Sequence, residues 1–177
     1  MTNAKVIINR LEEFGILKQG HTGRSLIEHL EGTYNILKKW NCCEDLCLAG
    51  LCHSIYGTES YKKQTVPLES RTSVKKLIGK DAEELAYLFG AHKKEYFWEL
   101  LGENKNFNIH DRFSDQIINI GKDQVSSLVT LTLANWLEQR PMVDKKYHQI
   151  RKNEFLHSKQ FLPAIAYSEF KQAYNIN

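Results

Sequence analysis

The sequence lacks long apolar runs and a strong excess of charge, and each absence excludes a class of protein. No apolar stretch approaches the roughly 20 residues of a membrane-spanning helix, and the N-terminus MTNAKVIINR lacks the apolar segment of a secretion signal. The formal net charge is only +3, and the lysines are scattered. We therefore predict a cytoplasmic protein that binds neither nucleic acid nor a membrane surface.

Proline is also scarce, and nothing in the chain marks a boundary between domains. There are three prolines, and we find no low-complexity linker, internal repeat or long charge run. A length of 177 residues with 42% hydrophobic content suits one domain with a sizeable core. We predict a mostly α-helical single domain over residues 1–177, with its motif region at about 20–140 and further helices at 141–177.

Cysteines are few and crowded, and no CxxC pair occurs. Cys42, Cys43, Cys47 and Cys52 fall in one segment, where thiols adjacent or one helical turn apart make poor structural disulfides. This usage fits a reducing compartment. A zinc site built from thiols is one alternative, but Cys47 and Cys52 lie in the apolar run LCLAGLC, which favours core packing.

The histidines, by contrast, lie at informative places. In SLIEHLEGTYNILKKW, residues 25–40, His29 shares one helical face with Leu26, Leu30 and Leu37. The next helix, at about 44–53, is apolar nearly all round and ends at His53, as expected of a central buried helix. Both imidazoles are therefore predicted to face the core.

Two later segments repeat this arrangement. DAEELAYLFGAHKKEYFWELLG, residues 81–102, has amphipathic spacing that turns His92 inward, and KDQVSSLVTLTLANWLEQR, residues 122–140, does the same for Asn135. An exposed helix is predicted at 70–79, a small β-hairpin near 107–120, and a closing helix or helix pair near 155–174.

Four polar side chains thus lie on the apolar faces of four helices. Each would cost roughly 1–3 kcal/mol if it were buried without a partner, so we expect something to satisfy them together. Separate hydrogen bonds in the core are one solution. The other is a metal site in which three histidines leave one coordination position open, as catalytic zinc requires. The predicted ligands are the three imidazoles of His29, His53 and His92, with Asn135 as a weak amide ligand.

The order of His29, AGLCHS and LANWLEQ resembles the H…HD…D signature of the HD superfamily, which consists of helical metal-dependent phosphohydrolases. The arrangement is most similar to the hydrolase domain of bacterial alarmone enzymes, with AALLHD and LADKL in these places. GRSLIEHLEGTY, CLAGLCHSIYGTE, DRF and NWLEQ together look closer still to a family of small HD-like proteins of bacteria and plants. The resemblance covers about residues 20–140 and implies an HD-like helical bundle.

The chain departs from the HD signature at both carboxylates, where it has Ser54 and Asn135. Neutral imidazoles with an amide oxygen would hold Mg²⁺ or Mn²⁺ weakly, whereas zinc, iron or nickel accept imidazole readily. The expected cofactor is therefore a divalent ion, with zinc, iron or nickel ahead of manganese. The alternative is a protein without metal.

The resemblance also implies where the reaction would take place. We predict Glu59 as a general base, with Tyr56 and Ser54 beside it; in the alarmone hydrolases an acidic pair stands where this chain has Gly57 and Thr58. The opposing interpretation makes Glu59 an exposed loop carboxylate and Tyr56 a core residue.

Five residues are predicted to bind the substrate. A guanidinium can bind a phosphate or carboxylate in bidentate fashion, and it can equally brace a helix or pair with an acid such as Asp111. The predicted substrate-binding residues are His21, Arg24, Thr58, Arg112 and Glu138.

Two functions follow, and the sequence leaves both open. The first is a metal-dependent hydrolase that acts on a phosphorylated or nucleotide-like small molecule. The second is a degenerate HD module that has lost hydrolysis and binds a small ligand or a protein partner in the same pocket. Oxygenase chemistry at histidine-bound iron is less favoured, because related sites use bridging carboxylates that are missing here. The oligomeric state is not predicted.

Overall fold

The computed structural model describes residues 4–13, 20–21, 24–103 and 107–176, without the side chains at 12–13, 20–21, 24 and 102–103. These residues form a mostly α-helical domain with two small antiparallel ladders, which confirms the predicted fold class. The helices are α1 Ala4–Glu13, α2 Leu26–Lys39, α3 Glu44–Cys52, α4 Arg71–Ile78, α5 Lys80–Ala91, α6 Lys94–Glu103, α7 Lys122–Gln139, α8 Lys152–His157 and α9 Ala164–Ala173.

The strands are short. β1 Gly20–His21 pairs with β2 Arg24–Ser25, and β3 Asn108–Asp111 pairs with β4 Gln116–Asn119. The second ladder is the hairpin predicted near 107–120, whereas the first was not predicted. Among the helices of this part of the chain, none is long and apolar enough to cross a membrane.

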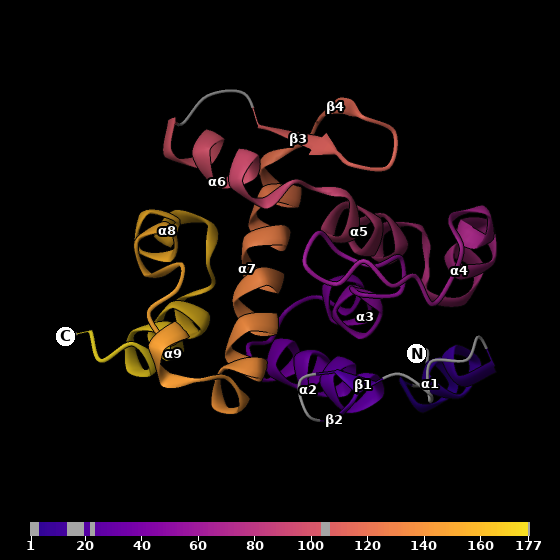
Figure 1. The fold of residues 1–177 in the computed structure, drawn as a ribbon, viewed down its shortest axis with the longest axis horizontal. Coiled ribbons are helices and arrows are strands. Elements are labelled where there is room, and N and C mark those ends of the chain that lie inside the picture. The colour runs from indigo at the N-terminus through magenta and orange to yellow at the C-terminus, as the bar shows by residue number, and fades with distance from the viewer. Residues whose placement is uncertain (1–3, 14–19, 22–23, 104–106, 177) are drawn as a thin grey trace.

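Helix α3 lies at the centre of the bundle, as its apolar sequence predicted. It packs on α2, α5 and α7, and every residue from Leu46 to Cys52 is buried. The long helix α7 separates α2, α3 and α5 on one side from α8 and α9 on the other (Figure 1). One apolar cluster joins α7 to α9 and includes residues of α2, α3, α5, α6 and α8. A second joins α1 to residues of α2, α3, α4 and α5.

The start of α2 fixes the position of His29. Ser25 accepts a hydrogen bond from the Glu28 backbone N–H at 3.2 Å, and the Glu28 carboxylate accepts one from the Ser25 N–H at 2.8 Å. This reciprocal capping box stabilises a helix by about 1 kcal/mol. His29 follows one residue later, on the buried face with Leu26 and Leu30.

The predicted continuous helical pattern over 81–102 is interrupted at His92. Helix α5 ends at Ala91, His92 is extended (φ −70°, ψ 137°), and α6 begins at Lys94. Strand β3 causes the break, because the Arg112 N–H donates to the Ala91 carbonyl and the Lys93 N–H to that of His110. Pairing with a distant segment has overridden the local amphipathic pattern here.

Helix α1 was not predicted from the sequence, where MTNAKVIINR was noted only because it lacks the apolar segment of a secretion signal. Its apolar face buries Ile7 and Leu11 beside α2 and α3 residues such as Leu26 and Leu51. Val6 is half exposed on the other face. The helix is amphipathic, so its pattern was available in the sequence.

Candidate functional site

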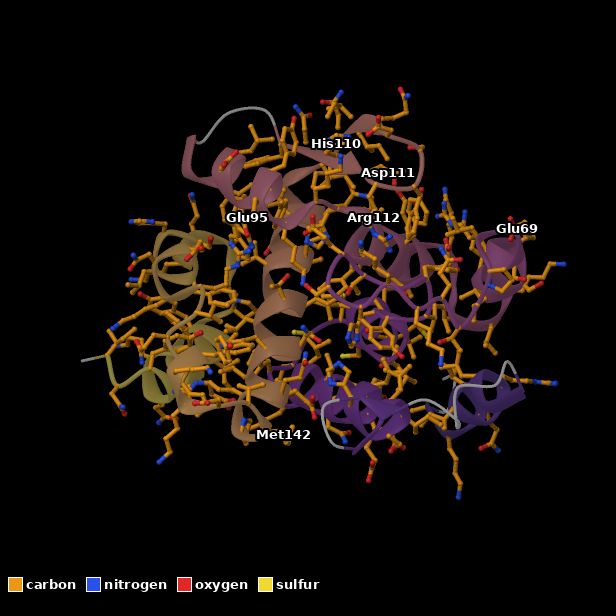
Figure 2. The ribbon with its side chains drawn as sticks, viewed as in Figure 1. Glu69, Glu95, His110, Asp111, Arg112 and Met142 are labelled. Carbon is orange, nitrogen blue, oxygen red and sulfur yellow. The ribbon has the colours of Figure 1, made fainter. Side chains whose placement is uncertain are left out.

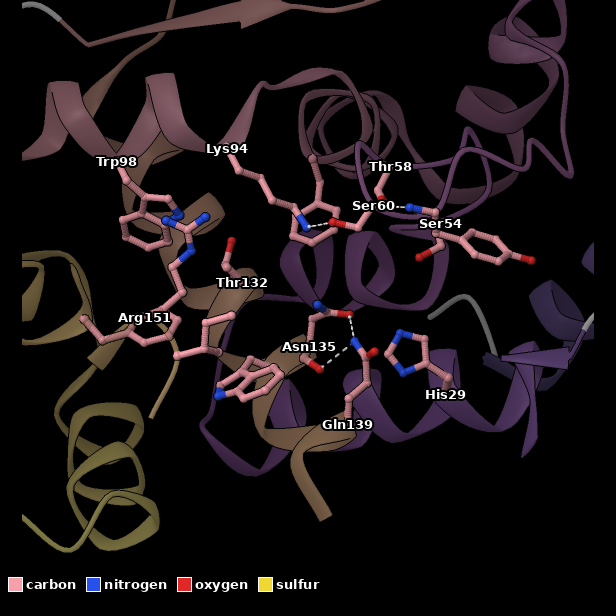
Figure 3. A pocket seen from close by; sticks show the side chains of 15 residues that line it. His29, Ser54, Thr58, Ser60, Lys94, Trp98, Thr132, Asn135, Gln139 and Arg151 are labelled. Atoms are coloured by element: carbon pink, nitrogen blue, oxygen red, sulfur yellow. Dashed lines mark hydrogen bonds between the residues drawn. The ribbon is translucent and has the colours of Figure 1, made fainter. Parts of the chain in front are cut away.

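The described residues enclose a cavity of about 470 Å³ between the two halves of the bundle (Figure 3). Its walls come from α2, the loop that follows α3, the start of α6, one face of α7 and the segment 150–155. His29 lies at one end of the view, and Trp98 and Arg151 lie at the other. The volume falls within the roughly 300–1,000 Å³ typical of sites for small ligands.

Two of the predicted metal ligands meet beside this cavity. The Nε2 atoms of His29 and His53 are 3.1 Å apart, and both rings are buried. Nδ1 of His53 is 2.7 Å from the carbonyl oxygen of Gly50, and Nδ1 of His29 lies against the carboxylate of Glu138. Glu138 on α7 and Gly50 on α3 thus orient the two imidazoles through their Nδ1 atoms.

The hydrogen bonds suggest how protons are arranged on the pair. A carbonyl oxygen only accepts, so Nδ1 of His53 donates to Gly50, and Nε2 of the neutral ring carries a lone pair. An ionised Glu138 likewise places a proton on Nδ1 of His29. Each Nε2 atom then carries a lone pair, and two lone pairs 3.1 Å apart repel each other. A cation between them, either a proton or a metal ion, removes this repulsion.

The donor set fits a metal only in part. With metal–nitrogen distances of about 2.0–2.1 Å, two ligand nitrogens of one ion lie roughly 2.9–3.4 Å apart, which includes the observed 3.1 Å. A catalytic zinc ion, however, has three protein ligands. Within the described residues, no group of three or more His, Cys, Asp or Glu side chains is placed to hold a metal. The pair is therefore an incomplete ligand set.

His92, predicted as the third imidazole ligand, lies elsewhere. Its ring packs between Phe89 and Phe97, and its Nδ1 donates to the carbonyl of Leu88 at 3.1 Å. Burial lowers the pKa of His92 to about 4, so the ring is neutral near pH 7. The prediction that His92 joins the ligand set was wrong, because the end of α5 holds the ring in the apolar core.

Asn135, the fourth predicted ligand, lines the same cavity as His29. Its side-chain oxygen accepts a hydrogen bond from Gln139 at 3.0 Å. Helical spacing along α7 brings both amides to the wall, and Figure 3 shows them next to His29. Asn135 is thus available to a ligand in the cavity.

Of the three predicted catalytic residues, only Ser54 lines the cavity. The Glu59 carboxylate accepts the backbone N–H of Lys94 at 2.9 Å and so caps the start of α6. Tyr56 is fully buried and donates to Glu83 at 2.9 Å. The structure therefore does not support Glu59 as a general base with Tyr56 beside it, because both side chains form hydrogen bonds between elements and neither lines the cavity.

Of the predicted substrate-binding residues whose side chains are described, only Thr58 lines the cavity. Its hydroxyl, however, accepts the Tyr61 N–H at 3.0 Å. Glu138 holds His29 and is not part of the cavity wall. The side chains of His21 and Arg24 lie outside the described residues.

Arg112 is the fifth predicted substrate-binding residue, and it braces the fold. Its Nε donates to the Gly90 carbonyl at 2.7 Å, and its guanidinium covers the ring of Phe113 at 4.1 Å. Asp111 accepts from Tyr87 and Ser114, and these hydrogen bonds help to lower its pKa against the opposing effect of burial. Figure 2 shows Asp111, the last residue of β3, and Arg112, which follows it, close to α5.

The cationic groups of the cavity were missed by the sequence reasoning. Lys94 and Arg151 line the cavity, and within the described part of the wall no carboxylate does. Lys94 donates to the Ser60 hydroxyl at 3.0 Å, and burial lowers the pKa of its amine. Arg151 pairs with the largely exposed Glu95 and with Glu154 at 3.1 Å. The described wall of the cavity therefore holds two basic side chains and no carboxylate, and part of it is apolar.

The C-terminal helices shape the apolar part of the wall. The Trp136 indole N–H donates to the Tyr174 hydroxyl at 2.6 Å, and that hydroxyl donates to the carbonyl of Ile150 at 2.6 Å. Trp136 and Ile150 both line the cavity, together with Trp98. Tyr174, near the end of α9, thus holds two walls in place.

A family model described as a domain of unknown function (DUF6817) matches residues 10–94. The matched part contains His29, His53 and Lys94, and it stops before the hairpin, α7 and the C-terminal helices. No curated protein and no solved structure was found to match the chain. The chain is thus similar over its first half to a family without an assigned function, and its resemblance to the HD superfamily stays a prediction.

Proposed function

We propose that this protein is a binding module of HD-like architecture whose cavity takes up a small anionic molecule. The observation that carries the proposal is the charge of the wall. Lys94 and Arg151 are the charged side chains that join His29 in the described lining. That lining contains no carboxylate, and the two acids that pair with Arg151, Glu95 and Glu154, lie outside it. In a partly enclosed space, two cations of this kind favour phosphate or carboxylate groups strongly.

The ion pair between Arg151 and Glu95 is compatible with this role. The side chain of Glu95 is 78% exposed, so the pair lies largely in water and is worth little. Glu154 also contacts the guanidinium, at 3.1 Å, and its side chain is 34% exposed. A ligand anion inside the cavity therefore competes with two carboxylates that both reach solvent. The apolar surfaces of Trp98, Trp136 and Ile150 would bury the remainder of the molecule.

Calorimetric titration with inorganic phosphate and with phenyl phosphate tests the proposal. We expect saturable binding that weakens as salt is added, since the attraction is electrostatic. Arg151→Gln should weaken binding about tenfold or more, which corresponds to one charge-assisted hydrogen bond. Lys152→Gln, its neighbour outside the cavity lining, is the matched control and should bind like the parent. Equal affinity in the two variants would contradict the proposal.

A metal-dependent hydrolase is the second candidate, and the geometry of His29 and His53 favours it. A metal ion bound there would supply a Lewis acid and an activated water. The described residues leave its ligand set incomplete, so we rank it below anion binding. Mass-spectrometric metal analysis of the parent, His29→Ala and His53→Ala tests it. Near-stoichiometric metal that both variants lose would reverse the ranking.

A further inference from the structure

Lys94 has different surroundings from the other lysines whose contacts the structure gives, because its side chain lines the cavity. Lys94 is the first residue of α6, and its Nζ lines the cavity with the Ser60 hydroxyl 3.0 Å away. Within the described part of the chain, no carboxylate lies within ion-pairing distance of this Nζ. The neighbouring Lys93, in contrast, contacts Asp115 at 3.6 Å and His110 at 3.2 Å on the outside of the fold.

The surroundings of Lys94 favour the uncharged amine more than those of an exposed lysine do. Burial is the largest influence that lowers its pKa, and the charge of Arg151 acts in the same direction. Glu59 opposes this effect, but its carboxylate accepts the backbone N–H of Lys94 and not the amine. The positive end of α6 adds to the repulsion of an ammonium group. Lys94 is partly buried and Ser60 is exposed, so the amine is partly desolvated. Desolvation and a second cation nearby are recognised ways to activate a lysine as a nucleophile.

We propose that Lys94 condenses with the carbonyl carbon of an anionic aldehyde or ketone whose acidic group is held by Arg151. The inference rests on the proposed anion site and adds the chemical class of the ligand. Figure 3 shows both side chains reaching into the same cavity, with the amine of Lys94 donating a hydrogen bond to the Ser60 hydroxyl.

The step balances without any redox partner. The nitrogen lone pair attacks the carbonyl carbon, and the carbonyl π electrons move to oxygen to give a carbinolamine. The oxygen takes one proton from the nitrogen and a second from solvent, which returns the proton that the ammonium group released before the attack. It then leaves as one water molecule, and a protonated C=N bond remains. The protonated imine retains the single positive charge of a lysine, so the charge of the cavity is preserved.

Glyoxylate with cyanoborohydride tests the inference on the full chain, since the hydride reduces the imine to a stable amine. Peptide mapping should then find the adduct first and most abundantly at Lys94, with far less at Lys93. Lys94→Arg keeps the charge and should lose the early adduct, whereas Lys93→Arg should keep it. Because mapping the parent already locates the adduct, the test stands even if a variant folds poorly.

Two results would overturn the inference. Labelling spread over surface lysines as readily as over Lys94 would show that the amine has no special reactivity. Equal labelling of Lys94 by propionaldehyde, a neutral aldehyde, would show that no anionic group is required. Phosphate binding measured on the same sample separates the proposals: binding without labelling at Lys94 removes only the imine, and labelling without phosphate binding removes the anion site.

Discussion

Replacing Gly32 by alanine should destabilise the protein, although alanine is the better helix former. Gly32 lies on α2, and an added Cβ would meet the Glu138 side chain at 2.5 Å from Oε1 and 2.8 Å from Cγ. Both distances are too short for a real contact, so Glu138 must move away from His29. The substitution therefore tests whether the Glu138–His29 contact exists.

The expected magnitude is the difference between two opposing effects. Helix propensity favours alanine by about 1 kcal/mol. Overpacking costs roughly 1–3 kcal/mol, and weakening a hydrogen bond to a charged group costs roughly 1.5–3 kcal/mol. Gly32→Ala should thus lower the free energy of unfolding by about 2–5 kcal/mol, as measured by urea denaturation with circular dichroism.

A double-mutant cycle supplies the control. In a Glu138→Ala background the obstructing side chain is absent, so Gly32→Ala should become neutral or stabilising by up to about 1 kcal/mol. The sign of its effect should therefore change between the two backgrounds. If Gly32→Ala has the same effect in both, Glu138 does not lie where the structure places it.

Three further predictions concern groups outside the cavity. His92 has a folded pKa of about 4 against 6.5 in the unfolded chain, so the unfolded state binds more protons between these values. Stability should therefore fall by about 3 kcal/mol from pH 7 to pH 4, and urea titrations of His92→Gln should lack this component. Burial raises the pKa of Cys47 and Cys52 to about 12, so a thiol reagent followed by mass spectrometry should modify exposed Cys43 first and spare the other two until urea unfolds the protein. Tyr56→Phe removes the hydrogen bond to buried Glu83 and should cost about 1–3 kcal/mol in the same urea assay; an unchanged midpoint would argue against the buried contact.

Helical periodicity predicted helical segments from α2 onward and the inward direction of His29 and His53, because both depend on local spacing along one helix. It failed at His92, where the helix break comes from pairing with strand β3 some 20 residues later. Helix α1 was a failure of interpretation, since its amphipathic face with Ile7 and Leu11 is visible in the sequence.

The cationic wall could not be predicted in the same way. Lys94 stands in a Lys-Lys pair that looks solvent-exposed, and only the break after α5 turns its amine into the cavity. Arg151 has a left-handed backbone (φ 60°) between short helical turns, where no periodic pattern indicates direction. Tertiary arrangement, and not local spacing, brings these two charges together.

Phosphate binding before and after removal of metal tests the central claim most directly. Because Lys94 and Arg151 are proposed to attract the anion, calorimetry should give the same affinity for inorganic phosphate after dialysis against a chelator as before it. Loss of binding upon chelation, with recovery when zinc is added back, would contradict the account and assign the site to a metal at His29 and His53.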